Sequence, residues 1–126
     1  MAIGVGLVLA ISGGIGVATT SDEPAERPAP AVARVVPDGV RVTLDRATWT
    51  PASVFRVVQE VGSLSQPDIE ATLNMGVGMA LVAPASSVDA LMATARDRGL
   101  GAWVVGEAAS ADGPAAVELV GEHPTD

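Results

Sequence analysis

The sequence predicts a small α/β (α+β) domain, a mixed sheet with helices packed on it. Apolar segments typical of strands alternate along the chain with segments of helical periodicity. The chain has 126 residues, which suffices for one domain of modest size. Its aromatic residues are only Trp49, Phe55 and Trp103, and it has no cysteine. The core must therefore be built mainly from aliphatic side chains, without disulfides.

The first thirty residues differ from the rest. Residues 1–20 form an apolar, glycine-rich segment that approaches the length of a membrane-spanning helix. Its glycines weaken a helix, and no basic residue precedes it as in a secretory signal. Two alternatives stay open: a membrane anchor or uncleaved signal, and an ordinary buried or disordered segment. Residues 21–32 are acidic and proline-rich, which indicates a linker, so we expect the folded unit to span residues 33–126.

The folded unit opens with a strand and a helix. Residues 40–44 alternate apolar and polar, which predicts a strand. Thr50 and Pro51 then predict the N-cap and first residue of a helix that ends at Gly62. Valines at helical spacing mark the apolar side of this helix: Val54, Val57, Val58 and Val61.

A shorter helix and a buried strand follow. Ser65 and Asp68 have the spacing of a capping box and predict a short helix. The apolar run from Met75 to Ala83, closed by a proline, predicts a buried strand. Ser86 or Ser87 then begins a third helix, which Gly99 ends.

Two strands complete the unit, at residues 102–106 and 116–120, with a turn at Asp112-Gly113-Pro114 between them. Because they are close in sequence, we expect them to pair as a hairpin, which makes the sheet mixed.

Candidate functional residues are few. Asn74, Gly76 and Gly78 stand at the start of the predicted buried strand, where glycine weakens a strand and permits close approach of a ligand or backbone. Asn74 either caps the preceding helix or lines a phosphate or substrate cleft. Arg46 follows the first strand, where it is either a ligand-binding group or part of a surface ion pair.

Composition excludes several classes of function. The formal net charge of −8 and the scarcity of aromatic residues argue against nucleic-acid binding. The chain has no lysine, which removes a Walker-type phosphate loop and Schiff-base chemistry. Its one histidine, His123, lies near the C-terminus, so a catalytic triad or a histidine-built metal site is not expected.

Four collinear stretches nevertheless resemble one enzyme family. They read L-D-R-A-T-W-T-P-A-S-V-F-R-V-V-Q-E-V-G (residues 44–62), T-L-N-M-G-V-G-M-A-L-V-A-P (72–84), A-W-V-V-G-E (102–107) and V-E-L-V-G-E-H-P (117–124). They resemble phosphoribosylformylglycinamidine cyclo-ligase, also called aminoimidazole ribonucleotide (AIR) synthetase. The likeness runs from about residue 33 to the end of the chain.

The resemblance implies a role in purine (IMP) biosynthesis. The family is a cytoplasmic homodimer that converts formylglycinamidine ribonucleotide to aminoimidazole ribonucleotide with ATP and magnesium. The resemblance places Asn74, Gly76 and Gly78 at the edge of its substrate cleft, and Arg46 is a further candidate for that cleft from its position after the first strand. The catalytic residues stay unassigned, and no metal ligand is expected in this chain.

Two departures from the family pattern matter. Leu73 replaces the usual aromatic residue of F-N-M-G, and the family's H-x-T-G-G-G-L segment does not precede residue 33. Ser12-Gly13-Gly14 matches this segment poorly and lies too far upstream. The likeness covers only the C-terminal part of such an enzyme and omits its ATP-binding domain.

Three hypotheses follow. The first is a C-terminal cyclo-ligase fragment, inactive alone and binding neither ATP nor magnesium by itself. The second is a stand-alone interaction module, membrane-tethered through residues 1–20. The third is a small-molecule binder that retains the substrate cleft. Whether this chain is itself an enzyme stays open.

Overall fold

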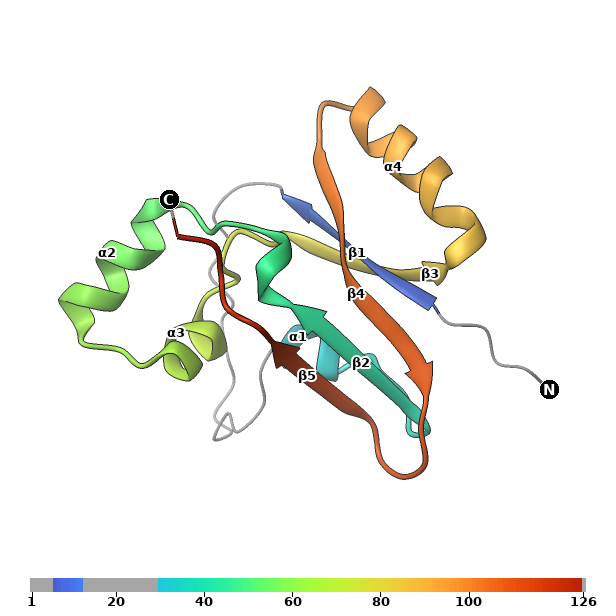
Figure 1. The fold of residues 1–126 in the computed structure, drawn as a ribbon, viewed down its shortest axis with the longest axis horizontal. Coiled ribbons are helices and arrows are strands. Elements are labelled where there is room, and N and C mark those ends of the chain that lie inside the picture. The colour runs from blue at the N-terminus through green and yellow to red at the C-terminus, as the bar shows by residue number, and fades with distance from the viewer. Residues whose placement is uncertain (1–5, 13–29, 126) are drawn as a thin grey trace.

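The computed structural model describes residues 6–12 and 30–125. It consists of one five-stranded mixed sheet with helices at its ends and on one face (Figure 1). The strands are β1 (Gly6–Ser12), β2 (Val40–Asp45), β3 (Met79–Pro84), β4 (Gly101–Ser110) and β5 (Ala116–Val120). The helices are α1 (Pro30–Ala33), α2 (Ser53–Gly62), α3 (Gln66–Thr72) and α4 (Val88–Asp97), with short 3-10 helices η1 (Arg46–Thr48) and η2 (Ala85–Ser87). The predicted fold class is confirmed.

The strand order is β3-β1-β4-β2-β5. All neighbouring pairs are antiparallel except β2 and β5, which are parallel. The expected hairpin of the last two strands is therefore wrong, because β2 lies between β4 and β5. The β4–β5 connection thus crosses over β2 instead of forming a tight turn.

The N-terminal segment contributes a strand to this sheet. β1 pairs with both β3 and β4 and so lies inside the sheet, although it precedes the unit that we expected to begin at residue 33. Residues 21–29 of the predicted linker lie outside the described residues, as does most of Ser12-Gly13-Gly14. The last three residues of the predicted linker, 30–32, instead belong to helix α1. In the parts of the chain that the structure describes, no helix is long and apolar enough to cross a membrane.

The core has two clusters. Val42 and Leu44 of β2 pack against Val105 and Ala108 of β4. A second cluster joins Phe55 of α2, Ile69 of α3 and Met75. Trp49 packs against both clusters and so links the sheet to the α2–α3 pair.

Close approach of β2 and β4 depends on one glycine. A Cβ atom at Gly106 would overlap the backbone carbonyl oxygen of Thr43 on β2. Any larger residue must push the two central strands apart, so glycine is required here for packing.

Helix boundaries follow the local sequence in part. Ser65 caps α3 by accepting a hydrogen bond from the Asp68 backbone N–H (3.3 Å), as predicted. The α2 prediction is displaced: the helix begins at Ser53, its N-cap is Ala52, and Thr50 and Pro51 lie before it.

Candidate functional site

The site is built around Arg46, which begins η1 directly after β2. Its Nε and Nη2 atoms donate to the two carboxylate oxygens of Glu70 on α3, at 2.7 and 2.8 Å. Its Nη1 atom donates to the backbone oxygens of Leu119 and Gly121, at 3.1 and 3.2 Å. Arg46 therefore joins the end of β2, helix α3 and the chain beyond β5. It is neither a free cation nor part of a surface ion pair.

Glu70 is the buried acidic partner, with 5% of its side chain exposed. Burial favours its neutral form, but hydrogen bonds from Arg46 and Gln66 and the charge of Arg46 outweigh that effect and lower the pKa of Glu70. The hydrogen bond with Glu70 raises the pKa of Arg46 in turn. The pair is thus a charged, bidentate contact with little access to water.

His123 also lies near the Glu70 carboxylate. Its Nδ1 atom is 3.1 Å from the Arg46 backbone oxygen and 3.3 Å from that of Trp49. Both are acceptors, so Nδ1 carries the proton. Its buried Nε2 atom has no hydrogen-bond partner in the described structure and lies 3.6 Å from Glu70 Oε1.

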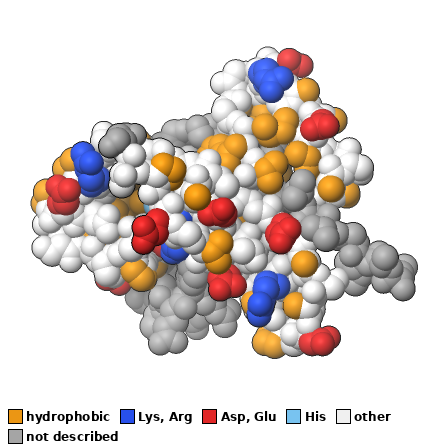
Figure 2. Space-filling model, viewed as in Figure 1, with side chains coloured by type: hydrophobic (Ala, Val, Ile, Leu, Met, Phe, Trp, Pro, Cys, Tyr) orange, Lys and Arg blue, Asp and Glu red, His pale blue; other side chains and the backbone are white. Residues whose placement is uncertain are grey.

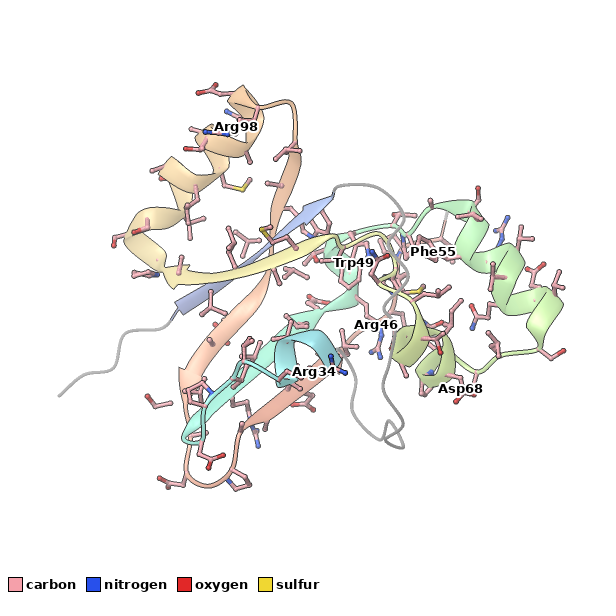
Figure 3. The ribbon with its side chains drawn as sticks, turned by 180° about the vertical axis from the view of Figure 1, so that it is seen from behind. Arg34, Arg46, Trp49, Phe55, Asp68 and Arg98 are labelled. Atoms are coloured by element: carbon pink, nitrogen blue, oxygen red, sulfur yellow. The ribbon has the colours of Figure 1, made fainter. Side chains whose placement is uncertain are left out.

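Trp49 packs edge-on against the His123 ring, with centroids 4.5 Å apart, and donates from Nε1 to the Met75 backbone oxygen (3.1 Å). Figure 3 shows Arg46, Trp49 and Phe55 gathered between the sheet and the α2–α3 pair, whereas Asp68 and Arg98 lie apart from them. The cluster fixes the segment that follows β5 against the domain.

The residues from Asn74 to Val77 form a turn, not the start of a strand. Met75 and Gly76 both have positive φ angles, of 53° and 93°. Asn74 Oδ1 accepts from the Gly76 backbone N–H (3.0 Å), and the Asn74 backbone oxygen accepts from Val77 N–H (2.9 Å). The predicted buried strand over 75–83 is therefore wrong in its first part: β3 begins at Met79 because Asn-Met-Gly favours a turn. It is also wrong in burial, because β3 is an edge strand of the sheet and Met79 and Val82 are more than half exposed.

Two cavities flank this arrangement. The larger, about 590 Å³, is lined by the α2 N-terminal region, the Arg46 cluster and the chain after β5. Its polar lining includes Arg46, Arg56, Gln59, Gln66 and His123. The smaller, about 180 Å³, is mainly apolar and lies beneath the turn.

The four predicted site residues do not share one cavity. Arg46 lines the larger cavity, Asn74 and Gly78 line the smaller one, and Gly76 lines neither. Met75 lines both cavities and lies between them.

Sequence reasoning missed Glu70 and His123. Glu70 lies on α3, next to the buried Ile69, and an acidic residue beside a buried position was the available signal. His123 was set aside for its position near the C-terminus, yet its side chain is 14% exposed.

The expectation that this chain alone binds neither ATP nor magnesium stays a prediction. No group of three or more His, Asp or Glu side chains that could hold a metal ion occurs among the described residues.

Comparison with known proteins points to one family. The model for "AIR synthase related protein, C-terminal domain" matches residues 29–117. A provisionally named phosphoribosylformylglycinamidine cyclo-ligase from Streptomyces fradiae is 48% identical over 96 residues, which are 73% of this chain and 53% of that protein.

Longer relatives carry the same name. The cyclo-ligase of Symbiobacterium thermophilum is 41% identical over 81 residues, which are 64% of this chain and 23% of that enzyme. That of a Synechococcus species is 38% identical over 77 residues, covering 61% of this chain and 22% of the enzyme. The chain thus spans about half of the first relative and about a quarter of the other two.

Proposed function

Because the chain belongs to the family of AIR synthase-related C-terminal domains, we propose that it supplies the ribonucleotide-binding part of a cyclo-ligase reaction site. In this proposal it acts in purine biosynthesis on formylglycinamidine ribonucleotide, and the ATP-binding part lies outside the matched region. The chain then binds the phosphoribosyl substrate or product but does not close the ring alone.

The observation that carries the proposal is the larger cavity. Its volume of about 590 Å³ is within the range of small-molecule sites. Arg56 lines it with an exposed guanidinium whose ion pair with Glu60 is long, at 3.9 Å. Guanidinium groups bind phosphate well, and the Gln59 amide oxygen adds an acceptor suited to a ribose hydroxyl, whereas the Gln66 amide is hydrogen-bonded to Gln59 and Glu70.

Arg46 has a positioning role in this proposal. Its guanidinium makes four hydrogen bonds within the protein, so it holds the wall of the cavity in place. Glu70 keeps this cation oriented, and His123 fixes the segment after β5 that also lines the cavity.

Isothermal titration calorimetry tests the assignment. We expect binding of formylglycinamidine ribonucleotide or aminoimidazole ribonucleotide, and no binding of ATP with magnesium. Arg56→Gln should weaken ribonucleotide binding by about tenfold or more, since it removes a charged phosphate contact. Arg98→Gln is the matched control, because Arg98 lies on the far side of the molecule (Figure 3). Equal binding by both variants would contradict this use of the cavity.

The proposal also implies a cytoplasmic protein and, through the intact enzyme, a homodimer. Fractionation of tagged protein checks the location. Recovery in the membrane fraction would instead favour the tethered interaction module.

A further inference from the structure

The larger cavity carries a carboxylate that the fold itself does not use. Among the described residues, Glu122 is the acidic side chain in the lining, and it follows β5 on the same segment as His123. Its side chain is exposed and makes no ion pair or side-chain hydrogen bond with another described residue. A carboxylate at a cavity that no protein group neutralises is available to a ligand.

The backbone on both sides of Glu122 is held in place. On one side, the Gly121 backbone oxygen accepts a hydrogen bond from Arg46 Nη1 (3.2 Å). Gly121 has a φ of 70°, and a Cβ atom there would lie 2.7 Å from an Asp45 carboxylate oxygen, so glycine is favoured at this turn. On the other side, His123 Nδ1 donates to the Arg46 backbone oxygen (3.1 Å). Glu122 is therefore an exposed carboxylate on a fixed backbone, as a preorganised binding group requires.

Two arginines also line the cavity, of which Arg56 remains available to a ligand. The Arg46 guanidinium makes four hydrogen bonds within the protein. The Arg56 side chain, on α2, is 73% exposed and lies 3.9 Å from Glu60. The cavity thus offers a ligand one positive group from α2 and one negative group from the chain after β5.

The charges on the surface do not form a patch of one sign. Figure 2 shows acidic and basic side chains interspersed over one face of the molecule, with both signs at the end formed by α2. Selection of a ligand by charge therefore depends on individual groups at the cavity, and not on the field of the whole face.

A ligand that matches Arg56 and Glu122 carries an anionic group and, at a distance from it, a cationic hydrogen-bond donor. Formylglycinamidine ribonucleotide has this pattern, with a phosphate at one end and an amidine at the other. An amidine is a strong base and a cation at neutral pH, and like a guanidinium it presents N–H groups that suit a carboxylate. The amide analogue, formylglycinamide ribonucleotide, has an oxygen at one of these positions, whose lone pairs would face the carboxylate.

We propose that Glu122 determines the substrate specificity of the larger cavity. Its carboxylate accepts hydrogen bonds from the protonated amidine while Arg56 binds the phosphate, and it disfavours the uncharged amide analogue, which brings an acceptor to the same place. This inference rests on the proposed function for the identity of the ligand. It assigns a binding contact and no step of the reaction.

Isothermal titration calorimetry with two ligands tests the assignment. Formylglycinamidine ribonucleotide and formylglycinamide ribonucleotide differ at one nitrogen. We expect the unmodified chain to bind the amidine about tenfold or more tightly than the amide, because the amidine alone donates charged hydrogen bonds. Glu122→Gln should bind the amidine about tenfold more weakly and the amide at least as tightly as before, so the preference should fall to about twofold or less.

Matched variants isolate the contact. Glu118→Gln is the control, because Glu118 is also exposed, lies on β5 and lines neither of the two cavities. It should keep the preference of the unmodified chain. Arg56→Gln should weaken both ligands alike, since both carry the phosphate. Urea unfolding checks that each variant is folded, as expected at exposed positions, and the comparison of the two ligands on the unmodified chain needs no variant.

Equal binding of both ligands by the unmodified chain would overturn the assignment of Glu122. So would a preference for the amidine that Glu122→Gln leaves unchanged, because another group would then recognise it. Either result would leave the proposed function intact, since the ribonucleotides still bind. Absence of binding by both ligands would instead refute the proposed function together with this inference.

Discussion

Replacing Arg46 by methionine tests whether the Arg46–Glu70 pair organises the junction between the sheet and α3. The change removes two hydrogen bonds to the Glu70 carboxylate and two to backbone oxygens. It leaves a carboxylate that is 5% exposed, with the hydrogen bond from Gln66 (2.8 Å) as its remaining side-chain hydrogen bond in the described structure and His123 Nε2 3.6 Å away. Removing one partner of a buried pair costs about 3–5 kcal/mol, a large share of the 5–15 kcal/mol that stabilises a typical domain.

The assay is urea unfolding at pH 7, followed by tryptophan fluorescence. The matched control is Arg56→Met, whose partner Glu60 lies 3.9 Å away with both side chains more than 70% exposed. It should change the free energy of unfolding by at most about 0.5 kcal/mol. Adding Glu70→Gln to Arg46→Met should recover about 1–3 kcal/mol, because the buried charge is then gone. Similar small losses for both arginine variants would show that the Arg46–Glu70 pair does not organise this junction.

Three further predictions concern the strand pair, the buried carboxyl and the turn. Gly106→Ala should lower the free energy of unfolding by about 3 kcal/mol or more, because its Cβ would overlap the Thr43 carbonyl oxygen. A melting temperature equal to that of the wild-type chain would contradict this. The lowered pKa of Glu70 adds stability that is present above the ordinary carboxyl pKa of about 4.3 and is lost as pH falls through the lower folded value. Urea curves between pH 2 and 6 should therefore show a shallower acid loss for Glu70→Gln, and an identical slope would refute the assignment. Asn74→Ala should cost about 1 kcal/mol, because the Gly76 N–H loses its acceptor, whereas Asn74→Asp keeps an oxygen there and should cost less by the same urea assay.

Local sequence patterns predicted the strands and the helix cap that depend on interactions between residues close in sequence. Strand β5 has the predicted bounds, and β2 extends the predicted one by a single residue. Ser65 caps α3 with its own side chain. The start of this helix could therefore be predicted from the four consecutive residues 65–68. The turn at Asn74 was misread because the apolar run around it outweighed the asparagine and glycine that determine its backbone.

Features with distant causes could not be predicted. The parallel pairing of β5 with β2 depends on the whole sheet, and periodicity assigns faces but not neighbours. The contacts of Arg46 with Glu70 and of His123 with the Arg46 backbone join residues far apart in sequence. The valines of α2 show a further limit, because an apolar stripe marks a helix face but does not say what covers it.

We propose that this chain forms one part of a cyclo-ligase reaction site and needs another part for catalysis. The direct measurement is formation of aminoimidazole ribonucleotide from formylglycinamidine ribonucleotide, ATP and magnesium by this chain alone. The full-length Symbiobacterium thermophilum enzyme serves as the positive control under the same conditions. We predict product from the full-length enzyme and none from this chain, and sustained turnover by this chain alone would contradict the claim.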